Sequence, residues 1–132
     1  MDRKFAIIGF IYGILGLTLG IYMAASKNHG QLVTHAHIML LGFMVSMVYA
    51  VCHKLWLENT GKLFSLIQFF AHQLGVLMLL SGLFLLYGGF FSGSLLEPLL
   101  SMGSIAILLS LVMMTVFICK VGKPSTQETL VQ

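Results

Sequence analysis

The sequence predicts an all-α protein that forms a bundle of four transmembrane helices. Of its 132 residues, 58% are hydrophobic and only 8% are charged, whereas about a quarter of the residues in a soluble domain are charged. Four segments contain no Asp, Glu, Lys or Arg: residues 5–26, 30–53, 63–96 and 98–119. A helix of roughly 20 apolar residues crosses the hydrocarbon layer of a bilayer, so each segment is long enough to span a membrane.

The four segments make one domain, residues 1–120, followed by a short polar tail at 121–132. The first segment begins like a signal peptide, with Arg3 and Lys4 before the apolar run. However, that run exceeds the roughly 7–15 residues of a signal's apolar core, and no Ala-x-Ala site closes it. We therefore expect it to remain as a helix. The third segment is long enough to cross and still supply a loop at 87–94, YGGFFSGS.

The basic residues predict the orientation. Six of the seven fall on one predicted side of the membrane: Arg3, Lys4, Lys54, Lys62, Lys120 and Lys123. Lys27 alone falls on the other side. Because positive residues favour the cytoplasmic side, we expect both termini to be cytoplasmic, in a bacterial inner (cytoplasmic) membrane. The basic residues do not cluster, which excludes a nucleic-acid partner, and two cysteines near cytoplasmic helix ends do not predict a disulfide.

Small and polar residues mark the helix faces that turn away from lipid. In segment 5–26 these are glycines spaced four, three and four: Gly9, Gly13, Gly16 and Gly20. Such a face favours close helix packing, and it would alternatively leave room for a flat macrocycle. In segment 30–53 the small and polar residues are His35, Gly42, Ser46, Tyr49 and His53, and in segment 63–96 they are Ser65, Gln68, His72 and Gly75. Both sets share one side of a helix, so we expect them to face the bundle interior.

Three histidines within the apolar segments are the candidate functional residues: His35, His37 and His72. Neutral imidazole suits metal ligation in an apolar bundle, and a buried iron porphyrin adds apolar faces that hydrocarbon solvates. The alternative is a neutral ring that is merely hydrogen-bonded. Hydrolytic chemistry is unsupported, because the few carboxylates lie at helix ends or in tails.

The stretch GIYMAAS…THAHIMLLGFMVSMVYAVCHKLW resembles a group of short four-helix membrane proteins related to the catalytic subunit of haem–copper oxidases. Its larger relatives are the cbb-type cytochrome c oxidase subunit I and the haem- and copper-containing membrane proteins of the nitric-oxide stress response. The shared pattern is His35-x-His37, then Leu-Gly-Phe at 41–43, then Tyr49 and His53. This resemblance, over roughly residues 16–85, implies that His35 and His37 are ligands of haem iron or copper. It does not imply oxygen reduction, because the chain lacks the paired histidines of a complete haem–copper centre.

The simplest haem site, a clamp between His72 and His35 or His37, is strained. If the second and third helices turn near residues 58–59, His72 faces residue 45 and His37 faces residue 80, a mismatch of about 12 Å along the helices. Weaker candidate ligands are Met44, Met113 and Met114, which would complete a site at the level of His72, and His53 at the cytoplasmic boundary. A second protomer is another source of a ligand.

Three hypotheses follow for the function. The leading one is an integral membrane protein that binds haem b for electron transfer or for binding a diatomic gas. The second is a copper protein with its site on the outer face, where Met23, His29, His35 and His37 lie close in sequence. The third is a structural or assembly partner of a respiratory complex. The expected partners are membrane lipid and either a second copy of the chain or a respiratory-chain protein.

Overall fold

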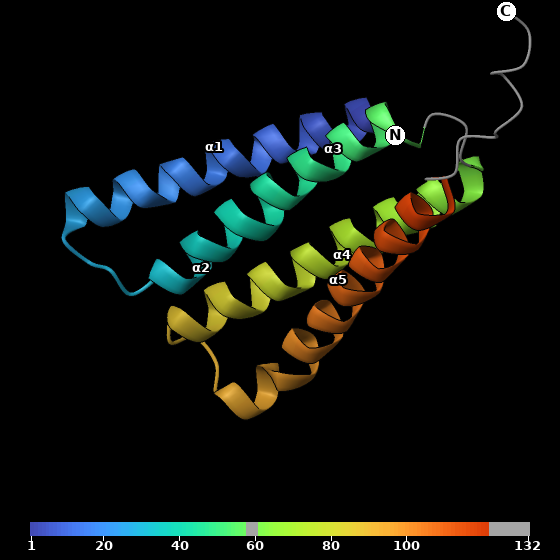
Figure 1. The fold of residues 1–132 in the computed structure, drawn as a ribbon. Coiled ribbons are helices and arrows are strands. Elements are labelled where there is room, and N and C mark those ends of the chain that lie inside the picture. The colour runs from blue at the N-terminus through green and yellow to red at the C-terminus, as the bar shows by residue number, and fades with distance from the viewer. Residues whose placement is uncertain (58–60, 122–132) are drawn as a thin grey trace, which may run out of the picture.

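The charge-free segments of the sequence form long helices. The computed structural model describes residues 1–57 and 61–121, and within these ranges every regular element is helical. In chain order the elements are α1 (Asp2–Ser26), α2 (Leu32–His37), η1 (Ile38–Val45), α3 (Ser46–Leu55), α4 (Lys62–Tyr87) and α5 (Gly93–Val121). The middle three run on as one helix, Leu32–Leu55, so the described chain has four helices long and apolar enough to cross a membrane (Figure 1).

One short connection follows α1, and a second is the predicted loop at 87–94, whereas the turn expected near residues 58–59 lies outside the described residues. Lys27 ends α1 in the left-handed conformation, with φ 55°. The loop expected at 87–94 begins where α4 ends at Tyr87. The last helix differs from the prediction, because α5 begins at Gly93 rather than at Pro98 and includes Pro98 in its second turn. The predicted tail lies outside the described residues except for Val121, which ends α5.

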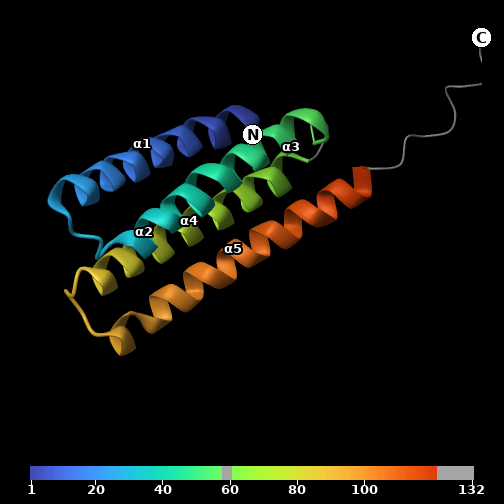
Figure 2. The same cartoon turned by 60° about the vertical axis from the view of Figure 1, so that its left-hand side comes forward.

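The helices pack in chain order (Figures 1 and 2), and side chains of all four long helices meet near the end that holds the start of α1. At that end Phe5 of α1 lies in one core cluster with Tyr49 of α3, Phe69 of α4 and Phe117 of α5. A second cluster, built on Tyr12, Val76 and Leu80, lies further along α1 and α4. The first cluster therefore joins all four long helices.

The glycine face of α1 packs against the second long helix. A Cβ atom on Gly13 would lie 3.2 Å from the ring of Phe43, and one on Gly9 would lie 3.3 Å from the Sδ atom of Met47. A Cβ atom on Gly20 would lie 3.0 Å from the Cε1 atom of His35. The packing interpretation of these glycines is confirmed. Side chains of the second helix fill the space in which a macrocycle would sit on this face.

The π-helical segment η1 was not predicted, and it changes which residues face the core. Thr34 and Ser46 are 1% and 0% exposed. On a regular α-helix these two positions would point about 120° apart. The wider turns of η1 bring both to the core, with buried Gly42 between them. The prediction that Gly42, Ser46, Tyr49 and His53 are buried is confirmed, whereas His35 is only half-buried.

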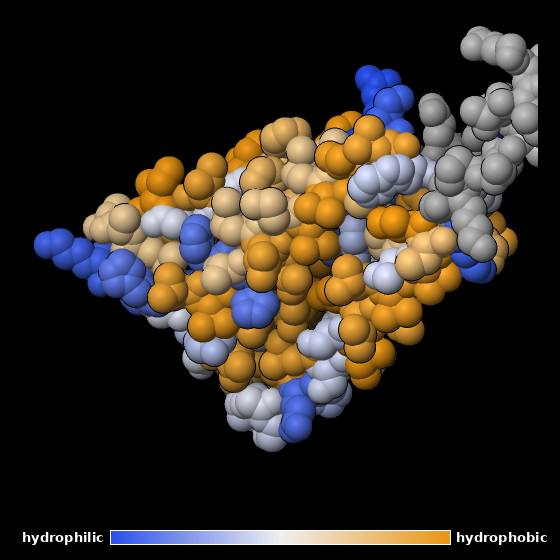
Figure 3. Space-filling view, in the orientation of Figure 1, coloured by the Kyte–Doolittle hydropathy of each residue, from blue (hydrophilic) through white to orange (hydrophobic). Residues whose placement is uncertain are grey.

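The outer surface of the helices is apolar, as a lipid-facing surface requires. Leucine, isoleucine, valine and phenylalanine side chains that are about half exposed or more occur on every long helix. Figure 3 shows apolar residues over most of the visible face, with most hydrophilic residues toward its ends. The described basic residues Arg3, Lys4, Lys54, Lys62 and Lys120 occupy helix ends that share one side of the bundle, and Lys27 lies at the opposite side.

Candidate functional site

The two histidines of the His-x-His motif begin the second long helix, and each ring is anchored by a backbone carbonyl. The Nδ1–H group of His35 donates to the carbonyl oxygen of Gly16 on α1, at 2.9 Å. The Nδ1–H group of His37 donates to the carbonyl oxygen of Val33 on its own helix, at 2.8 Å. A carbonyl oxygen only accepts, so Nδ1 must carry the proton in both rings. In the neutral rings the lone pair is therefore on Nε2.

The surroundings of these two rings differ. His35 lies over Gly20, where the absence of a side chain leaves room for the imidazole. His37 is hydrogen-bonded only within its own helix. Both rings are half-buried. The motif therefore presents two imidazoles in different directions, as the helical spacing predicts, and they do not converge on one point.

His72 belongs to a different part of the bundle. Its side chain is 0% exposed, and its Nε2 atom lies 3.3 Å from the Oγ atom of Ser46. This contact agrees within one residue with the predicted level of His72, opposite residue 45. His37 is nine positions before Ser46, which separates it from the level of His72 by about 14 Å along the helix axis. The structure does not bring His72 together with His35 or His37.

His72 is part of a buried polar cluster formed by three helices. We define the polar cluster as Ser46, Tyr49 and His53 of η1–α3, Ser65, Gln68 and His72 of α4, and Ser110 of α5, all of them buried. The rings of Tyr49 and His72 meet edge to face, with centroids 4.9 Å apart. Phe5 of α1 covers the cluster, stacked on His53 and edge-on to Tyr49.

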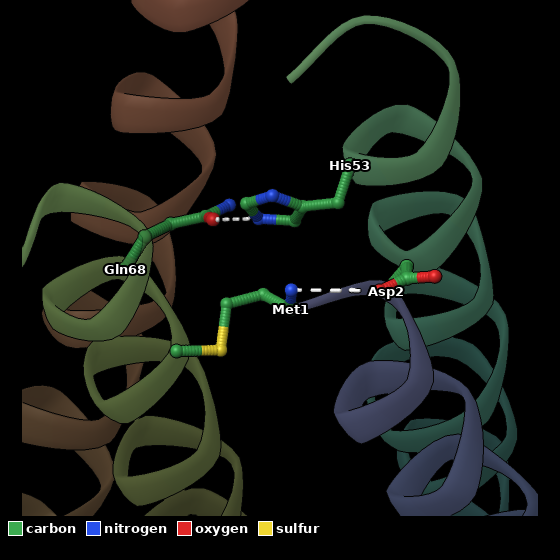
Figure 4. A network of polar contacts seen from close by, with 4 residues as sticks. All are labelled: Met1, Asp2, His53 and Gln68. Atoms are coloured by element: carbon green, nitrogen blue, oxygen red, sulfur yellow. Dashed lines mark hydrogen bonds and ion pairs between the residues drawn. The ribbon is translucent and has the colours of Figure 1, made fainter. Parts of the chain in front are cut away.

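Hydrogen bonds connect only part of the polar cluster. The Nε2–H group of His53 donates to the Oε1 atom of Gln68 at 2.8 Å (Figure 4). The hydroxyl of Ser110 donates to the carbonyl oxygen of Gln68 at 3.4 Å. Three buried atoms of the polar cluster have no hydrogen-bond partner in the described chain: Tyr49 Oη, Gln68 Nε2 and His72 Nδ1. The carbonyl group of Leu41 lies near the His72 ring but does not complete a bond to Nδ1.

A pocket of about 370 Å³ opens at the end of the bundle next to His53. Its lining combines apolar and polar side chains: Met1, Asp2, His53, Lys54, Leu57, Lys62, Ser65 and Leu66. Figure 4 shows Met1 and Asp2 beside the bond between His53 and Gln68. His53 and Ser65 thus belong both to the pocket wall and to the polar cluster.

The other sequence candidates are spread over the molecule. Met44 is 53% exposed on the outer surface, and Met114 is 3% exposed in the core cluster that contains Tyr49. Met113 is half-buried, and His29 is exposed in the loop after α1. Within residues 1–57 and 61–121, no group of three or more His, Cys, Asp or Glu side chains is placed to hold a metal ion.

Three buried polar residues were missed from the sequence: Thr34, Gln73 and Ser110. On a regular α-helix Thr34 would not share a face with the other polar residues of its helix. Its burial depends on the π-helical turns of η1, so the periodicity of the sequence did not predict it. Ser110 is a polar residue in the middle of an apolar segment, which is a signal that was present but not used. Gln73 follows His72 directly, and neither polar atom of its amide has a partner in the described chain.

No protein-family model, no curated protein and no solved structure matches the chain. The two sites described above therefore rest on their own geometry.

Proposed function

We propose that this chain is a multi-pass membrane protein that binds haem b through its His-x-His motif. The observation that carries the proposal is the anchoring of both rings by backbone carbonyls, with Nδ1–H as donor. Metal-bound histidines typically donate their second ring N–H to a carbonyl or carboxylate, which fixes the tautomer and the ring orientation. His35 and His37 are thus prepared as Nε2 ligands in an apolar setting.

His37 is the better placed of the two histidines to hold haem iron. Its hydrogen bond is made within its own helix, so ligation would not disturb the packing of helices. The ring of His35 is held against α1, by Gly16 and over Gly20. We assign His35 the role of second candidate ligand. His72 does not lie beside either ring, so any further protein ligand would come from another protomer or from a partner protein.

Haem suits the described residues better than copper does. The porphyrin supplies four of the iron ligands, so a single histidine is enough to hold haem. A copper site is typically built from several protein ligands, and no group of three His, Cys, Asp or Glu side chains is assembled in the described part of the chain. When bound, haem would supply one-electron transfer if two strong axial ligands are present, or binding of a diatomic gas if one position is open.

The orientation that we propose places the start of α1 and the end of α5 in the cytoplasm of a bacterial cell. Lys54, Lys62 and Lys120 lie at that end of the bundle together with Arg3 and Lys4, which the positive-inside rule assigns to the cytoplasm. The His-x-His motif would then lie near the outer face of the inner membrane. A redox partner on the outer side, or a second copy of the chain, would reach it there.

Histidine variants test the assignment of the ligands. We expect His37→Ala to lose most of the haem that co-purifies with the wild-type protein, because it removes the proposed iron ligand. His72→Ala and His29→Ala should retain it, since neither ring is near the motif. The measurement is the haem-to-protein ratio of detergent-purified protein, from the pyridine haemochrome spectrum. Haem loss in His72→Ala, with full retention in His37→Ala, would overturn the assignment.

A further inference from the structure

The polar cluster contains three donor or acceptor atoms that the protein itself does not satisfy. They are Tyr49 Oη, Gln68 Nε2 and His72 Nδ1, on residues that are at most 1% exposed. Buried polar atoms are nearly always hydrogen-bonded, and ordered water is the usual partner where the protein offers none. Ordered water beside these three atoms would supply the missing hydrogen-bond partners.

The polar cluster is continuous with the pocket at the end of the bundle. His53 and Ser65 line the pocket, and His53 bonds to Gln68. Ser65, Gln68 and His72 follow one another on α4 at spacings of three and four, so they lie on one side of the helix. A line of polar side chains therefore leads from the pocket to His72, with Ser110 of α5 bonded beside it.

Beyond His72 the interior becomes apolar. Gln73, the next residue, is also buried, but it lies about 100° around α4 from His72. On the side of α4 that carries His72, the following buried residues are Gly75, Val76 and Leu79. Val76 and Leu80 form the second core cluster with Tyr12. Ile38, Leu41 and Ile107 pack against this cluster. Water that enters from the pocket has no continuing line of polar side chains there, so the polar route ends at His72.

We propose that water fills this route from the pocket and that it gives His72 one-sided proton exchange with the aqueous phase. With the proton of the neutral ring on Nε2 and directed at the Oγ atom of Ser46, the unpartnered Nδ1 atom of His72 would accept a proton from a hydronium ion in the route. This step leaves water and an imidazolium ring, and the reverse step would return the proton. This site is distinct from the proposed haem ligands and does not depend on them. It assigns His72 the role of a proton acceptor inside the membrane.

The groups that face His72 do not supply a competing charge within the described chain. From α3 it meets Tyr49, from η1–α3 the hydroxyl of Ser46, and from α1 the ring of Phe5. His53 is the nearest titratable group toward the pocket, and Asp2, Lys54 and Lys62 lie at the pocket wall. Protons therefore enter through a pocket whose wall carries both acidic and basic side chains.

Deuterium exchange of the histidine Cε1 hydrogen tests the proposal directly. This exchange removes the Cε1 proton from the imidazolium form by hydroxide, so it requires both a proton and water at the ring. The full chain in lipid nanodiscs is incubated in D2O, and each histidine is followed by mass spectrometry. We expect the exchange rate of His72 to lie within about tenfold of that of the exposed His29. A His72 ring without access to water would exchange only when the bundle opens, which is rare. No measurable exchange at His72 while His29 exchanges fully would overturn the proposal.

A blocked variant then separates the route from general opening of the bundle. In Ser65→Leu the larger side chain closes the passage between the pocket and Gln68, and we expect His72 exchange to slow by about tenfold or more. Ser81→Leu is the matched control, because Ser81 is an exposed serine on the same helix, and it should leave the rate unchanged. Circular dichroism and gel filtration establish that both variants fold. Equal His72 rates in folded Ser65→Leu and wild type would contradict the route.

Discussion

The histidines of this chain differ in what their hydrogen bonds leave available. His35 and His37 use Nδ1 to bond backbone carbonyls, which leaves Nε2 for a metal. His72 instead points Nε2 at a serine hydroxyl and leaves Nδ1 without a partner. His53 is bonded to a glutamine amide. The ring nitrogen that a histidine leaves available thus depends on the single neighbouring atom to which the other nitrogen is bonded.

The bond between Ser46 and His72 should contribute to stability. Ser46→Ala removes this hydrogen bond from a site where both residues are 0% exposed. We expect a loss of about 1 kcal/mol in the free energy of unfolding, measured by reversible denaturation in detergent micelles. The control is Ser104→Ala, whose exposed hydroxyl bonds only to its own helix at Leu100. Equal stability of the two variants would show that the contact adds nothing.

Sequence alone predicted the kind of residue at the sites but not the partners. Periodicity placed Ser46, His72, Gln68 and His53 in the interior, and the hairpin register placed His72 opposite residue 45. It did not indicate which ring nitrogen carries the proton, because the carbonyl of Gly16 reaches His35 only through the packing of α1 on the second helix. Spacing on one helix cannot report a bond that a second helix supplies.

At the scale of elements, the helices were predictable and their irregularities were not. Charge-free length identified the four long helices, and the loop near 87–94 followed from the third segment, which is longer than one span requires. The π-helical turns of η1 leave no mark in the pattern of apolar residues, so the position of Thr34 was out of reach. π-helical turns are frequent at functional sites, and this one lies between the proposed haem ligands and the polar cluster.

The crossing of α4 and α5 depends on two glycines that bring the backbones together. A Cβ atom on Gly103 would lie 2.8 Å from the backbone nitrogen of Leu79 and 2.9 Å from the carbonyl oxygen of Gly75. Backbone atoms cannot move aside, so we expect Gly103→Ala to lower stability by about 1–3 kcal/mol. Thermal denaturation in detergent measures this loss.

Gly93→Ala is the matched control for this crossing. A Cβ atom on Gly93 meets only the side chain of Leu86, at the ordinary contact distance of 3.7 Å. Its denaturation temperature should stay close to that of the wild type. If Gly103→Ala is as stable as Gly93→Ala, the two helices do not cross in the way described.

For the whole molecule, composition predicted the solvent better than it predicted the function. A chain in which only 8% of the residues are charged has too few of them to form a water-facing surface. In the structure its apolar side chains accordingly face outward. Composition carries no information on what would complete the proposed haem site at His35 or His37. A single sequence encodes only one of the two surfaces of an interface, so the partners could not be predicted from it.

The proposed orientation predicts which side of the membrane exposes Cys119. This thiol is exposed near the end of α5, whereas Cys52 is buried. A membrane-impermeant maleimide should label Cys119 in inverted vesicles and not in intact spheroplasts, because that end faces the cytoplasm. In Lys27→Cys, at the opposite end of the bundle, the new thiol should be labelled in spheroplasts. Labelling of Cys119 from outside would reverse the orientation.

The measurement that tests the central claim most directly is a reduced-minus-oxidised absorption spectrum of the wild-type protein, purified from haem-replete cells. We expect a Soret band. Sharp α and β bands on reduction would mean two strong axial ligands and electron transfer, and a broad spectrum that shifts with carbon monoxide would mean an open position and gas binding. A protein purified in folded form from such cells without any haem absorbance would contradict the claim that His35 and His37 serve haem.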